Sequence, residues 1–236
     1  MTSTALDAVL ARTAYIEPHQ SIDHQRLWAD LLSSPALSFN LFGELTADLD
    51  LADRAVRSWF PDTPGRVSGV RFAHSPGWLD PAYLNSLRSF ATMFVVDLDD
   101  GSHGIIAVDI KYHERNKSET PRPDNLWRYT EVAERSAAFA PGTIDTLKRP
   151  GDLCVIWIEH LLLFSMLQHP GDNWTWGRLV VVQPAANCDA IDACARYRSM
   201  LADDATFATM TLEDLLDRHP ADASTVMALR NRYLGE

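Results

Sequence analysis

The stretch FATMFVVDLDDGSHGIIAVDIKY, residues 90–112, contains two runs of strand-forming residues on either side of Asp100-Gly101. Both runs are rich in β-branched and aromatic side chains, which are typical of strands. An Asp-Gly pair between two such runs favours the tight two-residue turn of an antiparallel β-hairpin. The sequence therefore predicts a hairpin at this point of the chain.

Asp109 and Lys111 lie two positions apart on the second predicted strand, so their side chains point to the same face of it. With a two-residue turn, residues equally far from the turn face each other, which predicts Thr92 opposite Asp109 and Phe90 opposite Lys111. A carboxylate there can bind a hard cation such as Mg²⁺, and an ammonium group can hold or activate a water molecule. The pair suits phosphodiester hydrolysis, although the same spacing also arises by chance in a solvated salt pair at a sheet edge.

The segments around the hairpin predict helices and further strands. A β-branched stretch at 66–72, RVSGVRF, predicts a short strand, and a charged stretch with two prolines at 113–125, HERNKSETPRPDN, predicts a long loop. The helices expected from apolar periodicity cover 22–32, 41–60, 126–138, 153–168, 189–201 and 211–217, and a buried strand is expected at 178–183. This order predicts an α/β fold with a mixed central β-sheet flanked by helices.

The chain has 236 residues, of which 46% are apolar and 22% charged, as in an ordinary folded protein. We expect a single domain over 1–236, with a core at about 33–203 between N-terminal helices and a C-terminal helical extension. Three cysteines without a CxxC pair predict reduced thiols and hence a cytoplasmic protein. Residues 1–20 lack the pattern of a secretion signal, and the most apolar stretch, 155–167, is too short to span a membrane.

The formal net charge is −11 at pH 7, from 21 Lys and Arg against 32 Asp and Glu. No overall positive field therefore attracts nucleic acid, and any contact with DNA must use a local patch. The one basic concentration follows the second strand of the hairpin and consists of Arg115, Lys117, Arg122 and Arg128. Because Glu114, Glu119 and Asp124 interrupt it, a mixed solvated loop is an equal alternative to a phosphate-contacting surface.

Four segments together resemble a bacterial branch of the PD-(D/E)XK nuclease superfamily, the restriction-endonuclease-like proteins. They are SPALSFNLFGEL (34–45), AVDIKYHE (107–114), IWIEHLLLFSMLQ (156–168) and NCDAIDACARYRSML (187–201). The resemblance covers about 33–234 of the chain, and AVDIKYHE is its most specific part. It implies a restriction-endonuclease-like fold and a metal-dependent nuclease acting on DNA, with Mg²⁺ as cofactor and Mn²⁺ as its substitute. It places Asp109 and Lys111 at the (D/E)xK positions.

Several positions depart from the pattern of this family. A second acid normally comes from the strand before the D-x-K strand, where the predicted register places Thr92. A further acid follows the phenylalanine of a stretch such as VRFAHSP, where this chain has Ala73. Val155 and Ile158 stand at helix positions that are usually Gln and Arg. With one carboxylate left, Mg²⁺ would bind weakly, since such sites depend on anionic oxygen ligands.

Carboxylates from elsewhere in the chain could complete the metal site. Glu44 is the first choice as an additional catalytic residue and metal ligand, because members of the family often supply an acid from their opening helix. The alternatives are Asp80, Glu131 and Glu159. His160, next to Glu159, is a candidate general acid or base, but a helix histidine packed against the sheet is the more frequent case.

Two functions from different classes follow. The first is a metal-dependent nuclease in which Asp109 and Glu44 bind Mg²⁺ and Lys111 holds the attacking water, with DNA as the substrate. The second is a catalytically inactive pseudonuclease of the same fold, which binds a protein partner or a second copy of itself as a binding or regulatory subunit of a larger assembly. The acidic composition and the missing acids favour the second function, whereas the retained D-x-K pair favours the first.

Overall fold

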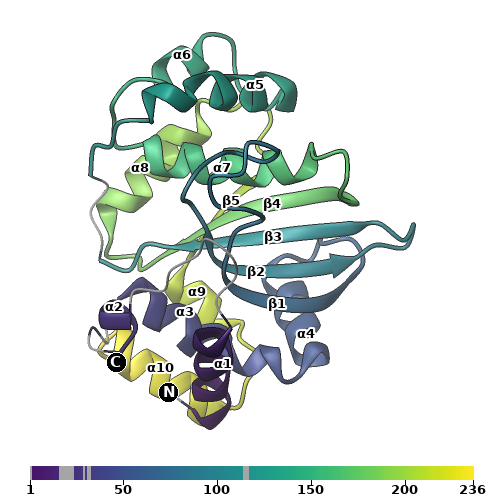
Figure 1. The fold of residues 1–236 in the computed structure, drawn as a ribbon. Coiled ribbons are helices and arrows are strands. Elements are labelled where there is room, and N and C mark those ends of the chain that lie inside the picture. Colours follow the sequence, from purple (N-terminus) through teal and green to yellow (C-terminus); the bar gives the residue numbers. More distant parts are fainter. Residues whose placement is uncertain (1, 16–23, 29, 31–32, 114–116) are drawn as a thin grey trace.

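A five-stranded β-sheet with the order β1-β2-β3-β4-β5 forms the centre of the protein (Figure 1). The structure is a computed structural model that describes residues 2–15, 24–28, 30, 33–113 and 117–236. The strands are β1 (Arg66–His74), β2 (Phe90–Asp97), β3 (His103–Ile110), β4 (Trp174–Gln183) and β5 (Phe207–Thr211). The first three strands pair antiparallel, whereas β4 and β5 run parallel to β3, so the sheet is mixed, as predicted.

Helices cover both faces of this sheet (Figure 1). One face carries α5 (Leu126–Ser136), α6 (Thr143–Leu147), α7 (Cys154–Leu167) and α8 (Cys188–Arg198). The other face carries α1 (Ser3–Ala14), α2 (His24–Trp28), α3 (Ser34–Phe42), α4 (Leu49–Trp59), α9 (Leu212–Asp217) and α10 (Ala223–Tyr233). Two short 3₁₀ helices, η1 (Gly43–Thr46) and η2 (Pro123–Asn125), precede α4 and α5. The architecture is therefore an α/β sandwich of three layers.

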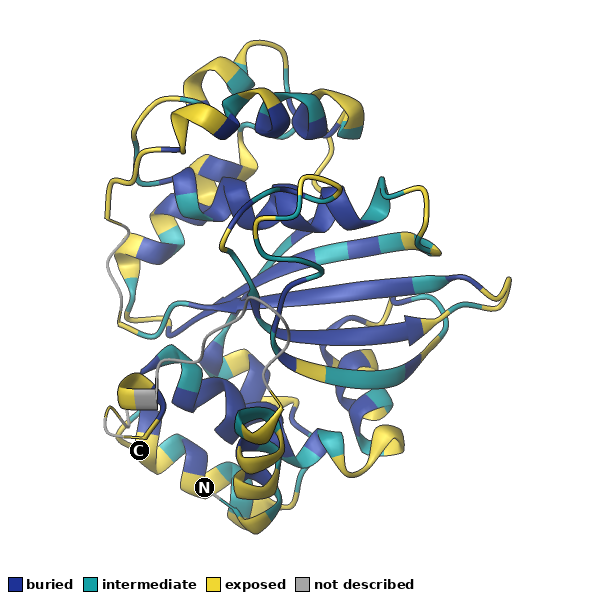
Figure 2. Ribbon diagram, viewed as in Figure 1, coloured by how far each residue is buried: buried dark blue, intermediate teal, exposed yellow. Residues whose placement is uncertain are grey.

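Each face of the sheet packs against its own hydrophobic core, and the central strands are buried from both sides (Figure 2). Along β3, Ile105 and Ala107 belong to the core under α7, whereas Ile106 and Val108 belong to the core under α3. This alternation follows from the two-residue period of a strand. Asp109 lies on the same face of β3 as Ile105 and Ala107, which α7 covers. The packing of these neighbours therefore fixes the position of its carboxylate.

The hairpin predicted at 90–112 is confirmed, but its register differs by one residue from the predicted one. Thr92 pairs with Val108, and not with Asp109. The turn contains three residues, 99–101, because Leu98 N–H donates to Ser102 O at 2.9 Å and Gly101 adopts a left-handed φ of 82°. Thr92 therefore faces the opposite layer, where its hydroxyl lies 2.6 Å from that of Ser38.

Most of the other predicted elements are present. The predicted segments 66–72, 126–138, 153–168, 178–183, 189–201 and 211–217 correspond to β1, α5, α7, β4, α8 and α9. Of the predicted helix 22–32, residues 22–23, 29 and 31–32 lie outside the described residues, as do residues 114–116 of the predicted loop 113–125. The predicted helix 41–60 is interrupted: α3 ends at Phe42, η1 follows, and α4 begins only at Leu49, where the Asp48 carboxylate caps it by accepting a hydrogen bond from Leu51 N–H at 2.9 Å. The sequence did not predict α1, most of α3, α6, β5 or α10. None of the helices in the described part of the chain is long and apolar enough to cross a membrane.

Candidate active site

Asp109 and Lys111 lie at the end of β3, in the middle of the sheet, and their side chains meet. Lys111 Nζ lies 2.7 Å from Asp109 Oδ2, and the two side chains are only 14% and 12% exposed. The backbone is held on both sides, since Lys111 N–H donates to Val182 O of β4 at 2.9 Å and Asn187 Nδ2 donates to Lys111 O at 3.0 Å. The D-x-K pair predicted from the sequence is therefore a buried ion pair on a rigid strand.

Glu159 supplies a second carboxylate to this pair. It projects from α7, a helix that is apolar on all sides and buried between the sheet and α5. The Glu159 side chain is 5% exposed, and its carboxyl group lies close enough to that of Asp109 for the two to share a hydrogen bond when one of them is protonated. No N–H or O–H donor among the described residues reaches Glu159 Oε2. Burying this carboxyl group therefore costs less free energy when it is protonated than when it is charged.

Asp109, Lys111 and Glu159 shift one another's pKa values. Burial raises the pKa of Glu159 to about 8, and the negative charge of Asp109 adds to this effect. Burial also acts against the charge on Asp109, but the Lys111 ammonium and the hydrogen bond from Glu159 outweigh it and hold the pKa of Asp109 below its ordinary value. Burial opposes the charge on Lys111 as well, but Asp109 and Glu159 raise the pKa of its ammonium group. At neutral pH the cluster is an ion pair with one protonated carboxyl group beside it.

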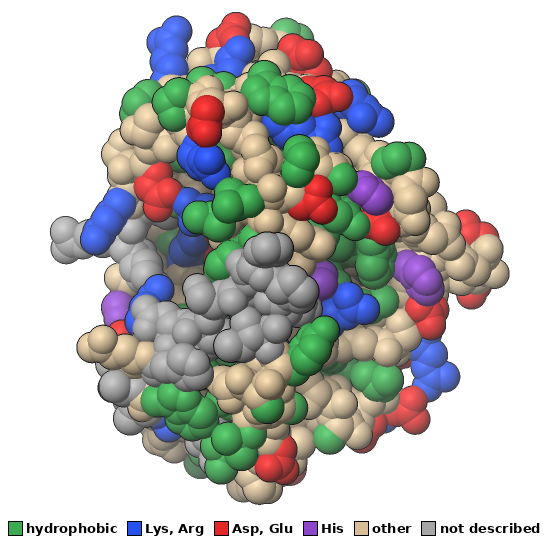
Figure 3. Space-filling model, viewed as in Figure 1, with side chains coloured by type: hydrophobic (Ala, Val, Ile, Leu, Met, Phe, Trp, Pro, Cys, Tyr) green, Lys and Arg blue, Asp and Glu red, His purple; other side chains and the backbone are tan. Residues whose placement is uncertain are grey.

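A cavity of about 840 Å³ opens beside Asp109 and Lys111. Among the described residues that line it, four are Lys or Arg and two are carboxylates, the reverse of the balance in the whole chain. Figure 3 shows Lys and Arg side chains beside a hollow on this face of the molecule. The charged residues that line the cavity are Arg26, Arg88, Asp109, Lys111, Lys117 and Glu119, joined by His113. The cavity is therefore suited to an anionic ligand, although the protein is acidic.

Glu44, the first choice of the sequence analysis, is not brought to this cluster. It lies in η1 on the α3 side of the sheet, where its charge acts on His219. The other two alternatives are also engaged elsewhere. Asp80 caps its own loop by accepting a hydrogen bond from Ala82 N–H at 2.8 Å, and Glu131 pairs with Arg128 at 2.8 Å.

Apart from Thr92, which faces the opposite layer, the positions that depart from the family pattern lie at the cavity or next to Glu159 in the sequence. Ala73 and Val155 line the cavity, and Ile158 is buried beside Glu159 on α7. Ala73 has a left-handed φ of 45°, which side chains other than Gly, Asn and Asp adopt rarely. The wall of the cavity is thus apolar on the side of Ala73 and Val155, and ionic on the side of Asp109.

His160, the neighbour of Glu159, is a packed core histidine, as the sequence analysis favoured. Burial lowers its pKa to about 3, so the imidazole is neutral. Its two ring nitrogens lie 2.9 Å from the Tyr197 hydroxyl and 3.0 Å from the Thr206 hydroxyl. Both ring nitrogens are therefore engaged by neighbouring hydroxyl groups.

The family model of the PD-(D/E)XK nuclease superfamily matches residues 1–235. The chain belongs to this superfamily. The predicted restriction-endonuclease-like α/β fold is confirmed, since the mixed sheet with helices on both faces agrees with it. No curated protein and no solved structure matches the chain significantly.

Members of the superfamily generally use divalent metals, and the donor set of this site fits one cation. Asp109 and Glu159 present two carboxyl groups to each other, and one of them carries a proton that a cation could replace. No group of three or more His, Cys, Asp and Glu side chains with metal-ligand spacing occurs among the described residues. The described part of the chain therefore offers two carboxylates here, so a bound Mg²⁺ would keep several of its waters.

Proposed function

We propose that this member of the PD-(D/E)XK nuclease superfamily is a Mg²⁺-dependent phosphodiester hydrolase that acts on DNA in the cavity beside Asp109. The observation that carries the proposal is the contact of Glu159 with Asp109, next to Lys111. It supplies a second acid where the sequence pattern lacked one. The excess of Lys and Arg around the cavity supports an anionic substrate, and the three free cysteines agree with a reducing, cytoplasmic compartment.

Asp109 and Glu159 would hold the cation, and Glu159 would lose its proton on binding. A divalent cation at such a site polarises a phosphoryl oxygen and lowers the pKa of a bound water. Lys111 stays protonated, because the neighbouring carboxylates raise the pKa of its ammonium group. It therefore acts as a hydrogen-bond donor that orients the attacking water or a phosphate oxygen, and not as a general base.

Cleavage of plasmid and single-stranded DNA with Mg²⁺ or Mn²⁺ tests the proposal. Asp109→Ala, Lys111→Ala and Glu159→Gln should each reduce the rate about 100-fold or more, the range for groups that act on the reacting atoms. Glu134→Gln is the matched control for Glu159→Gln, because Glu134 is an exposed carboxylate on α5. Its rate should equal that of the wild type.

Glu44→Gln decides between the two candidate acids. Loss of cleavage in this variant, with cleavage retained in Glu159→Gln, would return the second metal ligand to Glu44. Cleavage that survives both Asp109→Ala and Lys111→Ala would show that the D-x-K pair is not the active site.

A second candidate function is a pseudonuclease that binds nucleic acid or a protein partner without cleaving. One observation favours it: Lys111 neutralises Asp109 in an ion pair of 2.7 Å and burial keeps a proton on Glu159, so the cluster carries no excess negative charge that requires a cation. Absence of cleavage at high protein concentration, together with absence of Mn²⁺ binding, would support this function over the first.

A further inference from the structure

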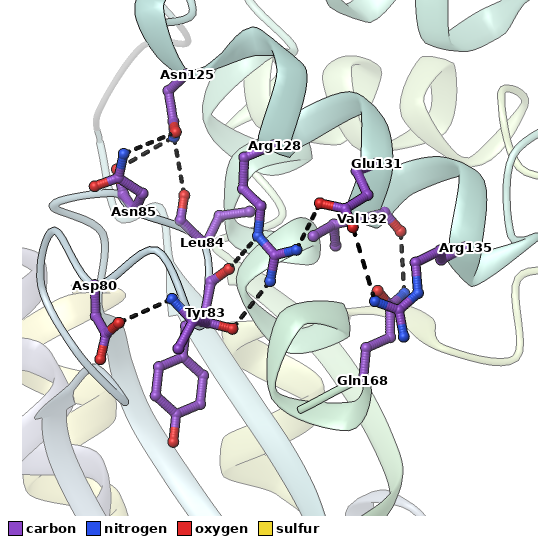
Figure 4. A network of polar contacts seen from close by, with 11 residues as sticks. Asp80, Tyr83, Leu84, Asn85, Asn125, Arg128, Glu131, Val132, Arg135 and Gln168 are labelled. Atoms are coloured by element: carbon purple, nitrogen blue, oxygen red, sulfur yellow. Dashed lines mark hydrogen bonds and ion pairs between the residues drawn. The ribbon is translucent and has the colours of Figure 1, made fainter. Parts of the chain in front are cut away.

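Arg88 is held at the wall of the cavity by the loop that precedes β2. This loop, 75–89, is held by α5 and η2: Arg128 Nε of α5 donates to Tyr83 O at 2.6 Å, and Asn125 Nδ2 of η2 donates to Leu84 O at 2.9 Å (Figure 4). Arg128 is itself only 8% exposed. The backbone before Arg88 is therefore fixed, and its guanidinium lies close enough to act on the charges of Lys111 and Glu159.

Glu119 lines the same cavity from a segment of the chain that precedes α5. Its backbone forms two hydrogen bonds with Gly151, just before α7, at 3.0 and 2.9 Å. Its carboxylate forms an ion pair with Arg88, and the two side chains are 44% and 30% exposed. Both residues line the cavity. A carboxylate of the protein itself is thus paired with a guanidinium that lies close enough to act on the D-x-K pair.

We propose that Arg88 is a phosphate-binding residue of the active site, and that the Glu119 carboxylate occupies the phosphate position on Arg88. A phosphodiester of a nucleic acid strand displaces this carboxylate when it binds. This inference rests on the proposed function, because it places the substrate in the same cavity. The planar guanidinium fork binds carboxylate and phosphate oxygens in the same way. The exchange is feasible because one anion with two acceptor oxygens replaces another, so Arg88 is never left without a partner.

The exchange also gives Glu119 a role in setting affinity. Each strand that binds must release Glu119 into water, and the ion pair is exposed enough for this to cost little. Removing the carboxylate of Glu119 should therefore strengthen binding modestly, and should do so only while Arg88 is present. A residue with a merely structural role would not show this dependence.

Binding of a fluorescent single-stranded oligonucleotide, followed by polarisation in EDTA, tests this inference on the full chain. At 0.15 M salt, Glu119→Gln should bind about two- to fivefold more tightly than the wild type, the range for an exposed ion pair. Its plot of log affinity against log salt should steepen by up to about 0.7, because one more phosphate is neutralised without charge exchange. Arg88→Ala should weaken binding, and Arg88→Ala with Glu119→Gln should bind like Arg88→Ala alone.

Asp145→Asn is the matched control. It removes one negative charge and releases Lys148 from an ion pair of 2.8 Å, and neither residue lines the cavity. This variant should bind like the wild type. Equal affinity of Glu119→Gln and the wild type, an equal gain in the Arg88→Ala background, or no binding by any variant would overturn the inference. Arg88-dependent binding without metal-dependent cleavage would contradict only the proposed function, whereas cleavage with binding insensitive to both residues would contradict only the inference.

Discussion

Glu159 keeps a proton at neutral pH because burial and the charge of Asp109 raise the pKa of its carboxyl from 4.5 to about 8. Between these pH values the folded state binds one proton more than the unfolded state, so the free energy of unfolding falls as the pH rises. In EDTA, the wild type should therefore lose stability from pH 6 to pH 9. The lowered pKa of Asp109 acts only at acidic pH and does not affect this window.

Glu159→Gln should remove this part of the pH dependence, because an amide does not titrate and can still donate a hydrogen bond to Asp109. At pH 9 the variant should be more stable than the wild type by at least about 1 kcal/mol, roughly the value of one pKa unit. Urea unfolding at both pH values measures the difference, with Glu134→Gln as control. Parallel plots of stability against pH for the wild type and Glu159→Gln would show that Glu159 does not hold the proton.

Ala73 occupies a backbone position that suits an acid better than an alanine. Its φ of 45° lies in the left-handed region, which Asp and Asn adopt more readily than Ala, and its side chain lines the cavity. We expect Ala73→Asp to add a third carboxylate and to tighten Mn²⁺ binding about tenfold, or about 1.4 kcal/mol. Calorimetric titration with Mn²⁺ tests this, with Ala73→Asn as the uncharged control. Equal affinities of the two variants would contradict the placement of this position at the metal site.

At the scale of elements, α5 matters because it holds the loop that carries Arg88. Arg128 donates hydrogen bonds to Tyr83 O and Ala82 O and pairs with Glu131 (Figure 4). Arg128→Met keeps the aliphatic volume but removes the donor from two partly buried carbonyls, at about 0.5–1.5 kcal/mol for each hydrogen bond. We therefore expect a loss of stability of about 2 kcal/mol in urea unfolding and faster amide exchange in 82–89.

Arg135→Met is the matched control for this prediction. Arg135 lies on the same helix, is 55% exposed and contacts Glu131 only at 4.0 Å. Its replacement should change stability by less than about 0.5 kcal/mol. Equal stability of the two variants would show that the hydrogen bonds of Arg128 do not hold the loop in place.

The hairpin shows which features of an element the sequence could predict. The runs of β-branched and aromatic residues predicted both strands, and the two-residue period of a strand placed Asp109 and Lys111 on one face. The register depended on whether the turn had two or three residues, and Asp99-Asp100-Gly101 is compatible with both. The single extra turn residue moved Thr92 to the other face of the sheet. A local hydrogen bond, Leu98 N–H to Ser102 O, decided the outcome.

Glu159 shows what an element can indicate when its composition is taken as a whole. In a helix that is apolar on every side, a carboxylate must be buried and therefore needs a partner. That signal could have placed Glu159 ahead of Glu44 as the second acid. The partner itself could not be predicted, because it depends on how α7 crosses β3. In the same way, β5 and α10 depend on contacts distant in sequence, such as the hydrogen bond of 2.6 Å between Asn40 and Tyr233.

At the scale of the whole molecule, the cation site and global stability are linked through the sheet. Asp109 lies on β3, which pairs with β2 and β4, and Glu159 lies on the helix that covers these strands. A cation bound between them would bind only the folded state, since unfolding separates the two carboxylates. It should therefore raise the melting temperature by mass action.

With a dissociation constant of about 1 mM, as expected for a site with few carboxylates, 10 mM Mg²⁺ should add about 1.4 kcal/mol, or roughly 3–6 °C, to the stability of the wild type. The shift should be larger at pH 8.5 than at pH 6.5, because Glu159, whose pKa is about 8, must release its proton when the cation binds. Asp109→Asn should abolish the shift and Glu134→Gln should retain it, as measured by differential scanning calorimetry at matched ionic strength. An equal shift in Asp109→Asn, or one that does not grow with pH, would mean that Mg²⁺ acts elsewhere on this acidic protein, and not between β3 and α7.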